Sequence, residues 1–184
     1  MISKQPGFKT STGKMFEELV LSWLYTHSNC SIPSIAAQST SSQLKIPACG
    51  ENNTLFFDSK TTMENGIKAK SAHPLMLIPT SLAFPTADAI ILTKTYIITV
   101  QITLSASHSA SNTGFDLIGN HLPSTTKKSK KWRHVFITDN LNKAASLRHQ
   151  TFNDLPSKYQ VFSAVFEVGK SIITHKHVKY FKMK

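Results

Sequence analysis

Two neighbouring apolar segments constrain the fold of this 184-residue chain more than any other feature. The first segment, residues 84–92, contains a proline that is followed by an apolar run. The second segment covers residues 96–104. The second segment alternates with a period of two, which predicts a β-strand. One of its faces is apolar, and the other carries Thr99, Gln101 and Thr103. A polar stripe on a buried strand is costly unless something uses it, and the simpler alternative is an antiparallel strand with one wet face.

The rest of the chain predicts helices and strands around these two segments. Residues 29–53 are rich in Ser, Thr and Asn and predict a long loop with one helical turn near 35–38, and residues 60–74 predict loop or partial helix. The expected helices are 12–28, 110–121 and 140–149, and the expected further strands are 55–57, 75–78, 132–138 and 159–168. This order predicts one α/β domain over residues 1–184, with a mixed sheet flanked by helices.

Charge is concentrated in the last third of the chain. The formal net charge is +11, and residues 125–184 hold thirteen Lys and Arg against three Asp and Glu. Such a segment favours a polyanion partner, because phosphates release counterions when lysines and arginines bind them. A solvated surface and a nuclear import signal at Lys127–Lys131 are the alternatives.

Four residues could build a centre for phosphodiester hydrolysis, which needs a divalent metal held by oxygen ligands. A carboxylate near the end of one strand, Asp88, precedes two residues at i and i+2 of the next strand, Gln101 and Thr103, which project from one face. The first helix adds Glu17 at the edge of its apolar stripe, whereas Glu18 faces water. The sequence therefore predicts Mg²⁺, or another divalent metal, on Asp88, Gln101 and Glu17.

This arrangement resembles the PD-(D/E)XK, or restriction-endonuclease-like, superfamily over roughly residues 12–138. The resemblance implies a restriction-endonuclease-like core, with two departures at the site. The second acid of the motif is Gln101, whose amide oxygen can coordinate a hard cation but supplies no charge, so metal affinity should fall. The motif lysine is the uncharged Thr103, and Lys60 and Lys94 are the nearby lysines that could substitute for it.

A narrower resemblance covers residues 84–91 (FPTADAII), followed by QITLS at 101–105 and by His108. This string resembles the C-terminal domains of Crinkler-type effector proteins of fungi and oomycetes, which are regarded as restriction-endonuclease-like. It implies an effector-like protein that acts on nucleic acid, often in a host nucleus. His108, just past the strand, is a candidate base or phosphate contact.

These observations predict a metal-dependent endonuclease, with DNA favoured over RNA as substrate. Thr103 and His108 would position water or phosphate at the metal. The expected contacts to the nucleic-acid backbone are Lys127, Lys128, Lys130, Lys131 and Arg133. Two alternatives stay open: a non-catalytic nucleic-acid-binding effector with the same fold, and a protein–protein module that docks an acidic host nuclear protein. A homodimer is also open, because nucleases of this class often pair to cut two strands.

The sequence lacks several other signals. Residues 1–10 contain no apolar leader, and the apolar stretch 87–104 is interrupted by Lys94 and polar residues. We therefore expect no membrane partner and an intracellular location. A nuclear location, including a host nucleus, is what the Lys127–Lys131 cluster and the Crinkler-type resemblance imply. Cys30 and Cys49 form neither a metal signature nor a disulfide framework. The aromatic and basic tail, residues 175–184, is expected to dock on the core, and the alternative is that Tyr180 and Phe181 stack on bases.

Overall fold

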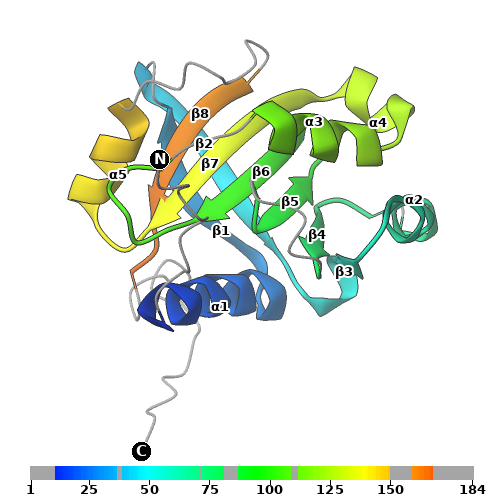
Figure 1. Ribbon diagram of the computed structural model, residues 1–184, viewed down its shortest axis with the longest axis horizontal. Coiled ribbons are helices and arrows are strands. Elements are labelled where there is room, and N and C mark those ends of the chain that lie inside the picture. The colour runs from blue at the N-terminus through cyan, green and yellow to red at the C-terminus, as the bar shows by residue number, and fades with distance from the viewer. Residues whose placement is uncertain are drawn as a thin grey trace, which may run out of the picture.

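A mixed sheet of eight strands organises the protein, for which a computed structural model describes residues 11–36, 39–70, 72–80, 87–108, 112–149 and 159–167 (Figure 1). The helices are α1 (Ser11–Thr26), α2 (Lys60–Ala69), α3 (Asn112–His121), α4 (Ser124–Ser129) and α5 (Leu141–His149). The strands are β1 (Ser28–Ala36), β2 (Ser39–Cys49), β3 (Thr54–Phe57), β4 (Leu75–Pro79), β5 (Ala89–Leu92), β6 (Tyr96–Ile102), β7 (Lys131–Thr138) and β8 (Tyr159–Val165).

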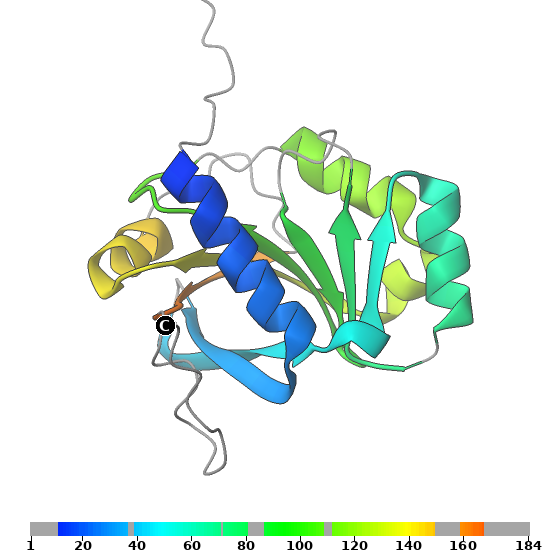
Figure 2. The same cartoon turned by 90° about the horizontal axis from the view of Figure 1, so that it is seen from below.

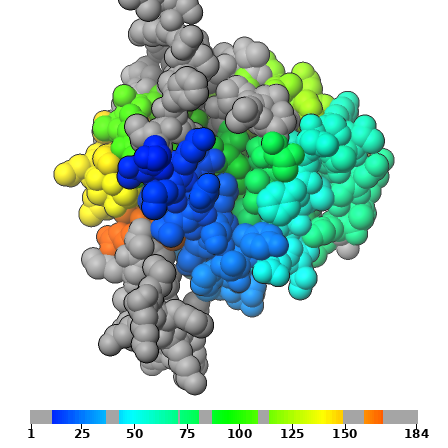
Figure 3. Space-filling view, turned by 60° about the horizontal axis from the view of Figure 1, so that its bottom comes forward, coloured from blue at the N-terminus to red at the C-terminus, as the bar shows by residue number. Residues whose placement is uncertain are grey.

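The strands are arranged in the order β2-β1-β8-β7-β6-β5-β4-β3. β4, β5 and β6 form an antiparallel meander, and β6, β7 and β8 run parallel to one another. The sheet curls strongly into a half-barrel, and α1 crosses it on one side (Figure 2). In the space-filling view from that side, α1 lies between α5 and the α2–β3 region (Figure 3). The expected α/β class with a mixed sheet is therefore confirmed.

One layer of the core lies between α1 and the sheet. Phe16, Val20, Trp23 and Leu24 recur at helical spacing and are buried, so α1 has one apolar stripe. This stripe packs against alternate side chains of the central strands, which include Ile98, Val100 and Ile102 of β6, Val135 and Ile137 of β7, and Phe162 and Ala164 of β8. The expected first helix and the expected apolar face of residues 96–104 are both confirmed.

The other layer lies on the opposite face of the sheet. Phe115 and Ile118 of α3 pack on Ile97 of β6, and Met63 of α2 joins the same cluster. Leu147 of α5 packs on Phe136 of β7 and Val161 of β8. β6 is therefore covered on both faces, and the alternative of a strand with one wet face is wrong: Thr99 is 0% exposed and Gln101 is 5% exposed.

The largest departure from the predicted elements concerns residues 28–36 and 39–49, which form the antiparallel strands β1 and β2 (the β1–β2 hairpin) instead of a loop. The apolar residues of these strands, among them Ile32 and Ile46, pack in the same buried cluster as α1. This contact between distant parts of the chain cannot be predicted from the sequence of residues 28–49 alone. Its prolines are compatible with the sheet: Pro47 lies in the edge strand, and Pro33 precedes the part of β1 that pairs with β8.

Smaller differences concern where the predicted helices and strands begin and end. Residues 60–69 form a complete helix that starts at a capping box between Ser59 and Thr62, and β6 ends at Ile102 rather than at residue 104. β5 begins at Ala89, and residues 84–86 of the FPTADAII string are outside the described part. The tail 175–184 also falls outside it. None of the helices in the described ranges is long and apolar enough to cross a membrane.

Candidate functional site

Asp88 and Gln101 are brought together where β5 begins and β6 ends. The register pairs Ala89 with Val100, so Asp88, the residue before β5, lies at the same end of the β5–β6 pair as Gln101. The backbone amide of Asp88 donates to the carbonyl of Val100 at 2.8 Å, which ties Asp88 to β6. Oδ2 of Asp88 accepts a hydrogen bond of 2.6 Å from the backbone amide of Ile102. The carboxylate is therefore held beside the carboxyl end of β6.

Gln101 links this ladder to His108. Its side-chain Nε2 lies 3.4 Å from His108 Nε2, so the amide can donate to an imidazole that carries its proton on Nδ1. Oε1 of Gln101 is buried and has no hydrogen-bond partner among the described residues. A buried carbonyl oxygen in that state is costly, which makes it a candidate ligand for water or a cation. The predicted association of Asp88, Gln101 and His108 is thus compatible with the geometry.

Thr103 and Glu17 are placed differently. Thr103 follows the end of β6, where its hydroxyl accepts from the amide of Ser105 at 3.0 Å and its own amide donates to Ile137 at 2.9 Å. Its hydroxyl therefore stabilises a turn. Glu17 lies half-buried on α1, which packs on the face opposite to Gln101, so β6 lies between α1 and the Gln101 side chain.

His134 on β7 is a part of this region that the sequence did not single out. Its Nδ1 lies 2.8 Å from the Thr99 hydroxyl, and the rings of Phe115 and Phe136 stand nearly perpendicular to its own at centroid distances of 5.0 and 4.6 Å. Burial, with a smaller contribution from repulsion by His108, lowers the pKa of His134 to about 3. His134 is therefore a neutral core imidazole behind the Gln101–His108 pair, and only its place in a buried strand could have signalled it.

A divalent cation fits the Asp88–Gln101 pair in its donor chemistry. One carboxylate and one amide oxygen are hard ligands of the kind that Mg²⁺ takes, and Mg²⁺ commonly completes its shell with water and substrate phosphate. Across the described ranges, no three or more His, Cys, Asp or Glu side chains converge as a metal site. The pair would therefore hold a cation only with several non-protein ligands.

Two of the five predicted backbone contacts are engaged within the protein. The Lys130 ammonium donates to the carbonyl of Thr93 and, at 3.1 Å, to that of Lys94. The Arg133 guanidinium lies 4.9 Å from the centre of the Tyr96 ring and donates to the carbonyl of Trp132 at 2.8 Å. These side chains join β7 to the β5–β6 turn, which leaves Lys127, Lys128 and Lys131 to meet a ligand.

Lys94 joins those three lysines in space. It lies in the β5–β6 turn, and the neighbouring Thr95 carbonyl accepts from the Lys131 amide at 2.9 Å. Lys94, Lys127, Lys128 and Lys131 therefore form one group, which we call the basic corner. Because Tyr96 pairs with Lys131 and Gln101 with Phe136, this corner lies at the opposite end of β6 from Asp88. Lys94 is thus too far from the site to replace the motif lysine.

Comparison with known proteins adds no relative. No family model, no curated protein and no solved structure matches this chain.

Proposed function

We propose that the protein hydrolyses phosphodiester bonds of nucleic acid at the Asp88–Gln101 pair, with a divalent metal and a restriction-endonuclease-like core. The observation that carries the proposal is that Asp88 and Gln101 lie at the same end of the β5–β6 pair, where the Asp88 carboxylate accepts from the Ile102 amide beside Gln101. DNA is the favoured substrate.

The element order supports this core. α1 is followed, after the β1–β2 hairpin and β3, by the β4–β5–β6 meander, and α3 then leads to β7, which pairs parallel with β6. This is the helix, three strands, helix, strand order on which the resemblance rests. The β1–β2 hairpin, β3, α2 and β8 are additions around it.

The chemistry of each side chain follows from its place. Asp88 and Gln101 would hold the metal, which when bound polarises the phosphate and activates water. His108 would accept a proton or contact the phosphate, because its ring is oriented by the Gln101 amide at the surface of the site. Thr103 would act indirectly by holding the turn that follows β6.

A cleavage assay tests the proposal with plasmid and oligonucleotide substrates, in Mg²⁺, Mn²⁺ or EDTA. Asp88→Asn and Gln101→Ala should abolish metal-dependent cutting, and Asp116→Asn, at an exposed acid on α3, should cut like the wild type. Asp88→Asn is preferred to alanine because an amide oxygen can still accept from Ile102. Cutting that survives both site substitutions would overturn the assignment.

A second candidate function is binding of nucleic acid without cleavage. It is favoured by the Asp88–Ile102 hydrogen bond, which gives the one carboxylate of the pair a structural role. The double substitution Gln101→Glu with Thr103→Lys restores the acid and the lysine of the superfamily motif. An inert wild type whose restored variant cuts DNA in Mg²⁺ would indicate a nuclease fold retained for binding.

The proposal extends to the setting of the protein. Action in a nucleus, including that of a host, is supported by the basic segment and by the Crinkler-type string. A homodimer would bring two sites to the two strands of a duplex. Sedimentation with and without a duplex measures this, and a monomer in both conditions would exclude the pair.

A further inference from the structure

We propose that Ser129 is a phosphorylation site for a protein kinase that selects basic segments, and that the phosphate neutralises the basic corner. In the transfer, Ser129 Oγ forms a bond to the γ-phosphorus of ATP, the bond from that phosphorus to ADP breaks, and the hydroxyl proton passes to a base of the kinase. The effect on nucleic acid rests on the proposed function, whereas the modification itself does not.

The charge around Ser129 distinguishes it from the other hydroxyl groups of α4. Lysines occupy all four positions within two residues of it, in the segment 127–131, and no acid lies among them. Ser124, at the other end of the helix, is also exposed but has no lysine within two residues. Opposite charges across an interface select the partner, so a kinase with an acidic substrate groove should choose Ser129.

The Ser129 hydroxyl is accessible. Ser129 is exposed and is the last residue of α4. Its Oγ donates to the carbonyls of Thr125, at 3.0 Å, and Thr126, at 3.4 Å, which belong to the same helix. These contacts are lost when the helix unwinds, so they do not hold the hydroxyl against the rest of the protein.

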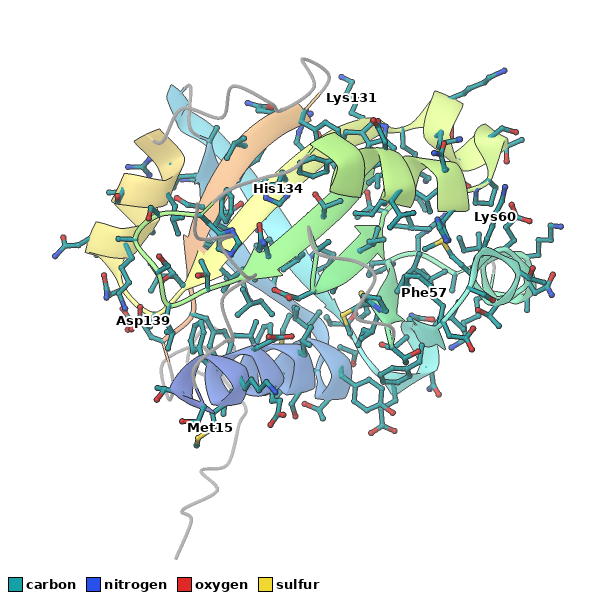
Figure 4. The ribbon with its side chains drawn as sticks, viewed as in Figure 1. Met15, Phe57, Lys60, Lys131, His134 and Asp139 are labelled. Atoms are coloured by element: carbon teal, nitrogen blue, oxygen red, sulfur yellow. The ribbon has the colours of Figure 1, made fainter. Side chains whose placement is uncertain are left out.

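The backbone around Ser129 can be extended at little cost. α4 has six residues, none of them buried, and Pro123 at its N-cap supplies no side-chain hydrogen bond. Helices this short are marginal without packing, so α4 can open locally while the sheet stays folded. On the other side of Ser129, Lys130 is already extended, with φ −122° and ψ 147°. Figure 4 shows Lys131 at the rim of the molecule, where β7 begins.

A phosphate on Ser129 would lie within the basic corner. Lys127 and Lys128 precede it, and Lys131 follows it beside the β5–β6 turn that carries Lys94. In the described part of the chain, none of these four lysines forms an ion pair. Phosphoserine carries a charge of about −2 at pH 7 and three acceptor oxygens, so it should cancel roughly half of the charge of the corner.

Mass spectrometry tests the site. The whole protein is incubated with ATP, Mg²⁺ and a kinase that selects basic residues on both sides of the serine, such as protein kinase C. We expect one phosphate on Ser129, which Ser129→Ala loses and Ser124→Ala keeps. A kinase that selects acidic flanks should leave the protein unmodified. No phosphate, or a phosphate only on Ser124, Thr125 or Thr126, would refute the site.

Fluorescence anisotropy with a DNA duplex tests the neutralisation, with kinase-treated Ser129→Ala as the matched control. Two cancelled charges should flatten the dependence of log Kd on log salt by about 1.8 and weaken binding at least about tenfold near 0.1 M salt. Phosphatase treatment should restore the affinity. Equal affinity of the phosphorylated protein and the control would show that the phosphate does not neutralise the corner.

Failure of the proposed function can be distinguished from failure of this inference. If the unmodified protein binds no duplex, binding of nucleic acid is refuted, and elution from heparin then measures the charge of the corner. The phosphorylated protein should elute at lower salt than kinase-treated Ser129→Ala. Elution of both at the same salt would overturn the inference.

Discussion

Oδ2 of Asp88 accepts a 2.6 Å hydrogen bond from the backbone amide of Ile102, fourteen residues further along the chain. The bond ties the residue before β5 to the last residue of β6, and it fixes the carboxylate beside the Ile102 amide, next to Gln101. Asp88 therefore combines a structural contact with its proposed role as a metal ligand, and two substitutions can separate these roles.

Asp88→Ala should lower the free energy of unfolding by about 1–3 kcal/mol, because the Ile102 amide loses its acceptor in a partly buried place. Asp88→Asn should lose less, since its amide oxygen can accept the same bond. Urea unfolding of the three proteins measures the difference. Equal stability of wild type and Asp88→Ala would show that the bond contributes nothing.

Acid should destabilise the protein through His134. Burial holds its folded-state pKa at about 3, below the ordinary value near 6.5, so below pH 6.5 the unfolded chain binds a proton that the folded protein does not. Its contribution to stability is therefore complete above about pH 6.5 and is lost as the pH falls toward 3, by at most about 1.4 kcal/mol per pH unit. Urea unfolding at pH 7.5, 6.0 and 5.0 should give a shallower slope for His134→Gln. Identical slopes would contradict this assignment.

Alanine substitutions at Gly66 and Gly119 should change the stability of the protein in opposite directions. A Cβ on Gly66 of α2 would lie 2.1 Å from Cδ2 of Leu55 on β3, so Gly66→Ala should displace the Leu55 side chain that packs against α2, at a cost of about 1–3 kcal/mol. A Cβ on Gly119 of α3 meets nothing within 4 Å, and Gly119→Ala should gain up to about 1 kcal/mol of helix propensity. Thermal unfolding compares the two, and a stabilised Gly66→Ala would refute the close packing.

Lys130→Met should destabilise the fold by about 1 kcal/mol, because the ammonium loses its bonds to the carbonyls of Thr93 and Lys94. The expected loss of stability is modest, since the Lys130 ammonium is partly exposed in the folded protein. Lys128→Met removes an exposed lysine of the same segment and should leave the unfolding midpoint unchanged. If both variants melt alike, Lys130 does not brace the β5–β6 turn.

Sequence reasoning succeeded where structure is encoded locally. The period-two pattern at residues 96–102 and the helical stripe of α1 concern neighbours in the chain, and both elements were predicted within a few residues. It failed for the β1–β2 hairpin, whose Ser-rich strands have weak local signals. Those strands are stabilised by pairing with each other and with β8, and by burial against α1, which are long-range contacts.

The same division holds for the candidate site. Spacing and resemblance predict Asp88, Gln101 and His108, and the antiparallel register of β5 and β6 brings the first two to the same end of the strand pair. The burial of Thr99 and Gln101 was missed, because the side chains that cover them come from α3, α5 and β7, at least ten residues beyond the strand.

By itself, the sequence determined the α/β class, most of the elements and the concentration of basic charge after residue 125. Only the tertiary structure decided how that charge is distributed. The parallel pairing of β6 with β7 aligns their amino ends, so Lys94 joins the basic corner, while Lys130 and Arg133 become internal contacts. Strand direction and register are properties of the whole sheet, and they put the corner and Asp88 at opposite ends of β6.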